Sequence, residues 1–304
     1  MALKIQETLS CSGRSVCRWL GLNRSTLRYA PRAVPDKKKL LEAEIVKMSK
    51  KYPCFGYRKI TRKLVEQGWA VGKKLVQRVR REECLKVPAP KPRKRRQGIS
   101  TGLPRRAKHR NHVWAWDFVS DHTVLGGKLR GLNLIDEFTK ECHCIHSDRA
   151  IKATDVLSIL EEAIKEHGAP EYIRSDNGPE FIATTIQQWL RDRRIKTIYI
   201  DPGCPWQNGY VESFNDKFRR ECLNRELIYT LSESCVIFAD YRHLHNYERP
   251  HRSLGLLTPK AYAKQLTCLS GLGRATPSLR QRGGQPQTKP QVNTEKKPLG
   301  NLSR

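Results

Sequence analysis

The sequence predicts an α/β domain in the second part of the chain, preceded by an all-α region. Residues 112–147 hold three strand-like runs, the first of them rich in aromatic and β-branched side chains. Residues 153–246 alternate amphipathic helical patterns with short strand-like segments. Residues 1–87 hold short helical patterns in pairs. A chain of 304 residues with 38% hydrophobic content is long enough to bury a core around such elements.

The order of the predicted elements narrows the fold class. Gly126 and Gly127 would turn the first strand into an antiparallel second strand, and a third strand follows directly. Helices and short strands then alternate, and two longer helices end the domain. Three antiparallel strands followed by helix–strand alternation is the order of a ribonuclease H-like sheet. The predicted elements are residues 112–124, 128–139, 141–147, 153–167, 171–175, 182–193, 196–200, 211–227 and 231–246.

Composition divides the chain into five segments. Residues 1–34 are expected to form a short helix-turn-helix unit, and residues 36–87 a second, helix-turn-helix-like domain. Residues 88–110 combine prolines with a basic run, which favours an extended linker. Residues 111–266 hold the α/β elements. Residues 267–304 are rich in Gly, Pro, Gln, Ser and Thr and are expected to form a disordered tail.

The positive charge is concentrated at the N-terminal end. Of the formal net charge of +28, residues 1–110 contribute most, with 31 Lys and Arg against 7 Asp and Glu. A localised excess of this kind indicates a polyanionic partner, and the phosphate backbone of nucleic acid rewards clustered Lys and Arg through counterion release. No apolar run approaches the roughly 18–20 residues that span a bilayer, which excludes a membrane protein.

The cysteine spacing and the first residues of the chain predict the cellular location of the protein. The ten cysteines contain no CxxC pair, and the first 25 residues carry three arginines and no apolar signal segment. We therefore expect reduced thiols in a cytoplasmic, nucleoid-associated protein.

Both N-terminal helix pairs present basic residues on a predicted exposed helix. In the first pair, Val16, Trp19 and Leu20 would share a buried face, and Asn23 or Ser25 would cap the second helix. Two such pairs in series predict DNA binding, whereas the alternative is a helical packing domain whose basic residues face water. The expected DNA contacts are Arg24, Ser25 and Arg28 in the first pair and Lys73, Lys74 and Arg78 in the second.

Three acidic residues on separate elements are the candidate catalytic groups. Asp117 interrupts an apolar strand, where a carboxylate is costly unless it is paired or binds a metal. Asp176 follows a strand, and Glu212 opens a helix after a glycine-containing loop. Taken singly, Asp117 could pair with an arginine, Asp176 could be a turn residue, and Glu212 could favour its helix dipole. Together they suit two Mg²⁺ ions, which activate a nucleophile and stabilise a leaving oxygen in phosphodiester chemistry.

The spacing and surroundings of these acids carry a family resemblance. Thirty-five residues separate Asp176 from Glu212, and the surrounding sequences are WAWDFVSD, IRSDNGPEF and PWQNGYVESFNDKFRRE. These motifs, with NYERPHRSLGLLTPKAYA at 246–263, resemble the integrase catalytic core of retroviral integrases and bacterial transposases. The best match is the B-frame transposase of two-reading-frame insertion sequences. The resemblance covers about residues 50–266 and implies that Asp117, Asp176 and Glu212 bind Mg²⁺ or Mn²⁺, two ions per site.

The resemblance also gives Arg219 a role. In this group a basic residue often follows the glutamate by seven positions, and Arg219 fills that position. Seven residues are about two helical turns, so Asn208, Glu212, Asn215 and Arg219 share one helix face. We expect Asn208, Asn215 and Arg219 to contact DNA near the metal site.

The function implied by the resemblance is metal-dependent cleavage and strand transfer at insertion-sequence ends. Its partners would be terminal-repeat and target DNA, bound by a homo-oligomer, with the upstream A-frame product or a fusion to it as a further partner. A catalytically silent DNA-binding regulator is the alternative, and a nuclease with the same core is a third possibility. These alternatives differ in whether DNA is only bound, only cut, or cut and joined.

Several other residues are alternative candidates for the site. Asp136 is the main rival of Asp117, while Asp121 and Asp201 could support the site or lie exposed. Cys142, His143, Cys144 and His146 superficially suggest zinc, but alternate strand residues face opposite sides, so ordinary packing is expected. His251 is expected to lie in a docking segment rather than to act as a general acid or base.

Overall fold

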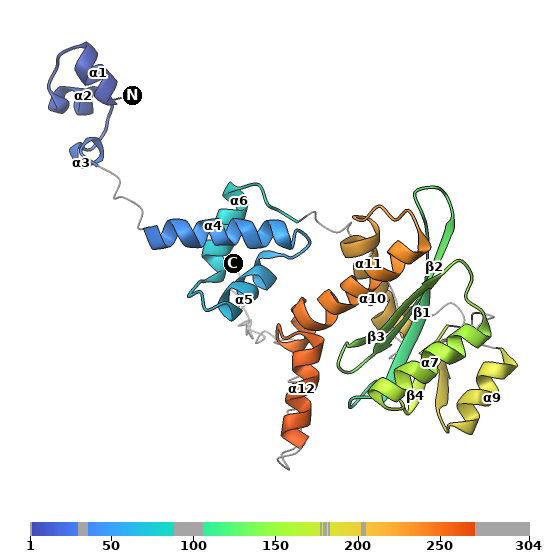
Figure 1. Cartoon of the computed structure of the whole chain (residues 1–304). Helices are drawn as coiled ribbons and strands as arrows, with labels where there is room; N and C mark the ends of the chain where they lie inside the picture. Colours follow the sequence, from blue (N-terminus) through green and yellow to red (C-terminus); the bar gives the residue numbers. More distant parts are fainter. Residues whose placement is uncertain are drawn as a thin grey trace, which may run out of the picture. The chain divides into compact units, whose positions relative to one another are not determined.

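The computed structural model describes residues 2–29, 36–87, 106–176, 178, 181, 183–201 and 205–270 (Figure 1). Most of the predicted linker (88–105) and of the predicted tail (271–304) lies outside these residues. Within the described residues, the chain divides after Ala263 into two units. In the part of the chain that is described, no helix has the length and apolar content needed to cross a membrane.

The first segment contains three short helices: α1 (Ala2–Thr8), α2 (Gly13–Trp19) and α3 (Arg24–Leu27). The prediction that Asn23 caps α3 is confirmed, because its side chain accepts a hydrogen bond from Ser25 N at 3.1 Å. The predicted packing face is only partly correct. Val16 is fully buried, but Trp19 is 62% exposed and Cys17 is buried in its place.

The second segment holds one helix more than the sequence patterns predicted. Helices α4 (Asp36–Lys51), α5 (Tyr57–Glu66) and α6 (Lys73–Glu82) share one apolar core. The α4 helix was not predicted. The buried faces of α5 and α6 recur at helical spacing, with Ile60 and Leu64 on α5 and Val76 and Val79 on α6. The predicted second helix pair is therefore the last two helices of a three-helix unit.

The α/β part is built on a five-stranded mixed sheet in the order β3-β2-β1-β4-β5. The strands are β1 (Val113–His122), β2 (Lys128–Asp136), β3 (Cys142–Asp148), β4 (Tyr172–Ser175) and β5 (Lys196–Tyr199). The first three are antiparallel neighbours, whereas β4 and β5 run parallel to β1. This order confirms the predicted ribonuclease H-like class, and it makes β1 the central strand.

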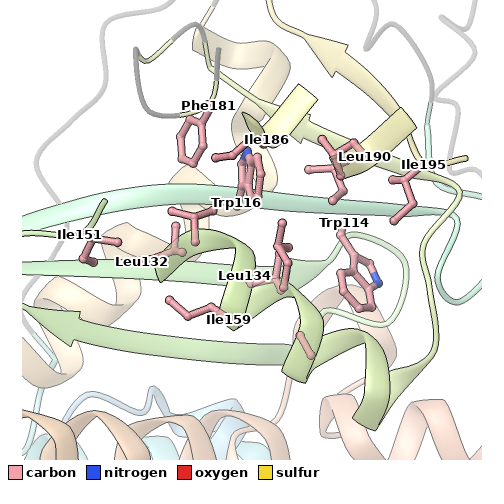
Figure 2. Packing of buried hydrophobic residues seen from close by; sticks show 14 residues of the cluster. Trp114, Trp116, Leu132, Leu134, Ile151, Ile159, Phe181, Ile186, Leu190 and Ile195 are labelled. Atoms are coloured by element: carbon pink, nitrogen blue, oxygen red, sulfur yellow. The ribbon is translucent and has the colours of Figure 1, made fainter. Parts of the chain in front are cut away.

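Helices cover both faces of this sheet (Figure 1). The helices α7 (Ala153–His167) and α9 (Thr184–Asp192) pack on one face, where Trp114, Trp116 and Leu132 meet α7 and α9 side chains (Figure 2). The helices α10 (Gly209–Phe218) and α11 (Leu231–His243) pack on the other face. Because β1 side chains alternate, its two tryptophans face α7 and α9, while Ala115 and Val119 face α10 and α11.

The remaining elements follow α10 and α11 in the chain. A 3₁₀ turn, η1 (Pro205–Asn208), leads into α10, which continues as the π-helical turn η2 (Arg219–Leu223). Likewise, α11 continues as η3 (Leu244–Glu248), and then η4 (Arg252–Leu254) and α12 (Pro259–Ser270) follow. The predicted helices over 211–227 and 231–246 are thus each a shorter α-helix with a π-helical end.

Candidate active site

Asp117 lies in the middle of the central strand on the face that α10 covers. It sits between Ala115 and Val119, which belong to the core beneath α10 and α11. Its Oδ2 accepts a hydrogen bond from Asn215 Nδ2 on α10 at 2.8 Å, and its Oδ1 accepts one from Phe118 N at 2.8 Å. The carboxylate is therefore half-buried between the sheet and the helix that carries Glu212.

Asp176 follows β4, the parallel neighbour of β1. In the register of these two strands, Ala115 stands opposite Arg174. The strand pairing ends there; Asp117 lies two residues beyond Ala115 in β1, and Asp176 lies two residues beyond Arg174, directly after β4. The Asp176 Oδ1 also accepts a hydrogen bond from Gly178 N at 3.2 Å, consistent with the predicted turn. Asp176 therefore directly follows the strand that pairs with the central strand.

Glu212 occupies the first turn of α10 and is exposed. The negative charge of Glu212 contributes to raising the pKa of Asp117. The pKa of Asp117 is raised to about 6, first by burial and then by the nearby charge of Asp176, with a further contribution from Glu212. Hydrogen bonds from Phe118 and Asn215 act in the opposite direction. Three carboxylates from distant parts of the sequence therefore share one electrostatic environment.

An amide network holds Asp117 in position. Asn133 is directly opposite Asp117 in the β1–β2 register, and its side chain is fully buried. Its Nδ2 donates to Asn215 Oδ1 at 2.7 Å, and Asn215 donates in turn to Asp117. Sequence reasoning missed Asn133, although a polar residue in the apolar run GLNLID is a usable signal. The sequence also predicts that Asn215 contacts DNA. In the structure the Asn215 amide is hydrogen-bonded to Asn133 and Asp117.

Asp136, the predicted rival of Asp117, has a structural role. It is fully buried, and its two oxygens accept hydrogen bonds from Asn111 N, Phe138 N, Thr139 N and the Thr139 hydroxyl at 2.7–3.0 Å. These donors hold the turn between β2 and β3. A carboxylate satisfied in this way has little remaining capacity to bind a metal ion.

Arg219 and Asn208 lie at the two ends of α10. The Arg219 guanidinium donates to Ser120 O at 2.7 Å and pairs with Asp121 at 3.3 Å, yet 43% of its side chain stays exposed. Asn208 is only 3% exposed, and its amide donates to Trp116 O at 3.5 Å. Asn208 is thus buried where η1 meets β1, and a buried amide does not fit the predicted DNA contact.

The predicted DNA contacts in the N-terminal helices lie on the surface, where the sequence patterns put them. All six residues are exposed: Arg24, Ser25, Arg28, Lys73, Lys74 and Arg78. A neighbouring arginine differs from them, because Arg80 is 4% exposed and donates to Ser49 Oγ and Leu85 O. The α6 helix therefore carries both solvent-exposed basic residues and a buried arginine that holds other parts of the helical unit.

Two other groups of side chains could hold a metal ion by distance alone. Among the described residues, possible ligand atoms lie within 4.8 Å of one another in the groups His109–His112–Glu171 and Glu141–His143–His167. Asp117, Asp176 and Glu212 are not a third such group, so their carboxylate oxygens do not all lie within 4.8 Å of one another. The buried thiol of Cys142 donates to Cys144 O at 3.4 Å.

Comparison with known families identifies two parts of the chain. Residues 107–205 and 193–259 match models described as integrase core domain, and residues 35–94 match one described as an HTH-like domain. An uncharacterized 31.7 kDa protein of insertion element IS407 from Burkholderia multivorans is 36% identical over 265 residues, covering 85% of this chain and 93% of that protein.

A further relative agrees with this assignment, and the chain also has similarity to solved structures. A 39.2 kDa protein of insertion element IS476 from Xanthomonas euvesicatoria is 34% identical over 86% of this chain and 75% of its own length. Among solved structures, a simian T-cell lymphotropic virus intasome has a TM-score of 0.44 at 17% identity, covering 83% of this chain and 80% of that chain. The HTLV-2 integrase catalytic core in complex with magnesium has a TM-score of 0.39 at 19% identity, covering 50% and 96%. From its sheet order, its domain matches and its insertion-element relatives, this chain belongs to the integrase-core transposases of bacterial insertion sequences, of the B-frame type.

Proposed function

We propose that this chain is a transposase that cleaves DNA at the ends of an insertion sequence and joins the new 3′ end to target DNA. The observation that carries the proposal is the electrostatic coupling of Asp117 with Asp176 and Glu212. Carboxylates grouped closely enough to raise the pKa of one of them are typical of divalent cation sites, because a cation relieves their repulsion. The all-oxygen ligand set suits Mg²⁺ or Mn²⁺.

Different residues have different roles in the proposed reaction. Asp117, Asp176 and Glu212 would hold two divalent ions, which activate the attacking oxygen and stabilise the leaving oxygen in an in-line displacement. Asn215, held by Asn133, orients the Asp117 carboxylate. Arg219, anchored on Ser120 O, presents part of its guanidinium to solvent close to Glu212, where it would bind a DNA phosphate.

The N-terminal helices would bind DNA outside the site of chemistry. Their exposed basic residues and the charge of residues 1–110 support phosphate contacts, and the HTH-like match supports a recognition helix. Two ends must be joined in one event, so we propose a homo-oligomer on DNA. The upstream A-frame product, or a fusion with it, is a proposed further partner. The segment boundaries at 34/36, 87/88, 110/111 and 266/267 are part of the same proposal.

The test is a cleavage and joining assay with the full chain. The substrate is DNA carrying the inverted repeats that bound the reading frame, with Mg²⁺ or Mn²⁺ added. The transposase proposal expects nicked ends followed by joined products, and both are lost in Asp176→Asn while DNA binding is kept. Nicked products without joining would assign the chain to the nucleases. DNA binding without any metal-dependent cleavage by the wild type would assign it to the silent regulators.

A further inference from the structure

A second basic site lies on the side of α10 that faces away from Glu212. A cleft of about 770 Å³ is lined by five Lys and Arg residues and by no Asp or Glu. Tyr210, Phe214 and Lys217 of the lining lie about 140–200° around the helix from Glu212, from the 3.6-residue turn. The lining is Lys59, Ile135, Lys140, Gly209, Tyr210, Ser213, Phe214, Lys217, His245, Arg249, His251, Arg252 and Ser253.

The acids near this cleft are already bound to other partners. Glu221 accepts two hydrogen bonds from Arg249 at 2.6 and 2.7 Å, and Glu137 is paired with the fully buried Arg174 at 2.7 Å. Asp136 is satisfied by the donors of its own turn. Lys59 Nζ lies 4.0 Å from the same Glu221 carboxylate, whereas Lys140, Lys217 and Arg252 have no ion pair among the described residues. A bound anion would complete the site at these three cations.

The ammonium groups are held at the cleft rather than spread into solvent. Lys140 Nζ lies 3.4 Å from the centre of the Tyr210 ring and donates to Glu137 O. Lys217 Nζ donates to the carbonyl and hydroxyl of Ser213. Lys140 also has a φ of +64°, a left-handed conformation that is uncommon for a lysine and costs free energy. The turn after β2 keeps this side chain at the cleft despite that cost.

Two buried imidazoles lie at the cleft, and each has one ring nitrogen without a hydrogen-bond partner among the described residues, Nδ1 of His245 and Nε2 of His251. His251 is 8% exposed and its Nε2 has no hydrogen-bond partner there. His245 lies against it with 4.7 Å between ring centres, and its Nε2 donates to Lys140 O at 3.0 Å. Burial holds the pKa of both rings below the usual range, so both are neutral at pH 7 and each has one N–H donor. His245 already gives its donor to Lys140 O, so only His251 can donate to a bound anion.

We propose that this cleft binds a phosphate of DNA outside the active site, on the opposite side of the helix that carries Glu212. The inference rests on the proposed function, because that function supplies a DNA partner. Since α10 lies between the two sites, a DNA segment held in the cleft is distinct from the phosphodiester at the carboxylates. The same helix would thereby fix the active site relative to a second stretch of DNA.

The protonation of the lysines gives this site a measurable signature. Burial lowers the pKa of Lys140 to about 7 and those of Lys59 and Lys217 to about 8. At pH 7.5 these amines are therefore partly deprotonated. A bound phosphate favours the ammonium form, so DNA binding should be accompanied by proton uptake. Fully exposed lysines have pKa values near 10.4, are already protonated at pH 7.5, and would take up no protons on binding DNA.

The test measures DNA affinity of the full chain in EDTA, so that no chemistry is needed. Lys217→Gln with Arg252→Gln is compared with the wild type on one duplex across a salt series, and Lys165→Gln on the exposed face of α7 is the matched control. Loss of one or two phosphate contacts should lower the salt slope by about 1–2 and the affinity about tenfold or more. The control should leave both unchanged.

A second variant and a second readout protect the test against misfolding. Lys140→Asn removes the charge, and asparagine tolerates a positive φ better than lysine does. It should keep the wild-type unfolding transition and lower both DNA affinity and proton uptake, the latter measured by calorimetry in two buffers of different ionisation enthalpy. Wild-type affinity, salt slope and proton uptake in the folded variants would overturn the inference.

Free phosphate is the competing source of the same chemistry. If inorganic phosphate or pyrophosphate binds the wild type at micromolar concentration while the double variant keeps its DNA affinity, the site serves a small anion and the DNA assignment is wrong. Failure of the proposed function is a separate result, because it appears as absence of cleavage and joining by the wild type with metal. The cleft variants are measured without metal and do not depend on that outcome.

Discussion

The side-chain amide of Asn215 donates a hydrogen bond to the carboxylate of Asp117 across the interface between α10 and the central strand, with 2.8 Å between Nδ2 and Oδ2. Its oxygen accepts a hydrogen bond from the buried Asn133 at 2.7 Å. With both ends of the amide engaged, Asn215 has one preferred orientation, and the Asp117 carboxylate has one preferred position. The helix that brings Glu212 to the site thus also positions the first aspartate.

Replacing Asn215 by alanine should weaken metal binding and slow cleavage by about 10–100-fold, as expected for a group that orients a metal ligand. Asn215→Asp should be worse, because it places a like charge next to Asp117. Calorimetric titration with Mn²⁺ and a cleavage time course measure the two effects. Gln188→Ala on the exposed side of α9 is the control. Full metal affinity in Asn215→Ala would remove Asn215 from this role.

The raised pKa of Asp117 predicts that its removal stabilises the metal-free protein. In the folded state this pKa is about 6, above the usual 3.8, so the charged form is disfavoured by folding. The resulting destabilisation is absent below pH 3.8 and complete above pH 6. Asp117→Asn should therefore raise the unfolding temperature in EDTA at pH 7.5 and leave it nearly unchanged at pH 4.

Added Mg²⁺ provides the control for this effect. It should raise the unfolding temperature of the wild type at pH 7.5, because a ligand that binds only the folded state stabilises it. The gain should be lost or strongly reduced in Asp117→Asn. An Asp117→Asn protein that is less stable than the wild type at pH 7.5 in EDTA would contradict the repulsion argument.

The buried ion pair between Glu221 and Arg249 should dominate the acid sensitivity of the α10–α11 side. Its side chains are 10% and 5% exposed, and Glu221→Gln leaves Arg249 unpaired at a cost of about 3–5 kcal/mol. The pair lowers the pKa of Glu221 below 4.5, so its stabilisation is present above pH 4.5 and is lost as the pH falls through the lowered value. Urea unfolding at pH 7 and at lower pH measures both effects.

A surface pair gives the comparison for that measurement. Arg193 and Glu161 are also within ion-pair distance, but their side chains are 38% and 45% exposed. Glu161→Gln should cost less than about 1 kcal/mol and should not change the acid transition. Equal costs for the two glutamate substitutions would show that burial does not control the contribution of these pairs.

Two kinds of basic residue on α6 predict opposite phenotypes. Lys73→Gln with Lys74→Gln should lower DNA affinity and its salt dependence without changing stability, because both side chains are exposed. Arg80→Gln should lower stability instead, because it removes buried hydrogen bonds to Ser49 Oγ and Leu85 O. Fluorescence anisotropy with duplex DNA and thermal unfolding separate the two results. A destabilised Lys73 and Lys74 double variant would argue that the lysines hold the helix unit together.

The sequence predicted the sheet because local and global signals agree there. The Gly126–Gly127 turn and the strand and helix patterns gave elements within a few residues of those observed, and the helix over 153–167 matches in both bounds. Strand alternation also places Asp117 on the opposite face from its neighbours Trp116 and Phe118. Asp117 was a candidate because a carboxylate in an apolar strand is unfavourable, whereas Asp176 and Glu212 were selected by their 35-residue spacing and the family resemblance.

Other features depend on contacts that a linear pattern does not contain. Trp19 fits a helical face in the sequence, but the short α2 packs through Val16 and Cys17. Asn208 and Asn215 lie on the same helix face as Glu212, yet they are held by β1 and Asn133. The basic cleft brings together Lys140, Lys217 and Arg252 from three separate segments. No spacing rule connects such residues.

The most direct test of the central claim is the position of a divalent ion in a crystal of the full chain soaked in Mn²⁺. Anomalous scattering should give its strongest peak between the carboxylates of Asp117, Asp176 and Glu212, and the peak should disappear in Asp176→Asn. The chain offers two competing positions, at Glu141–His143–His167 and at His109–His112–Glu171. A peak at either of these, with no density at the three carboxylates, would contradict the assignment of the active site.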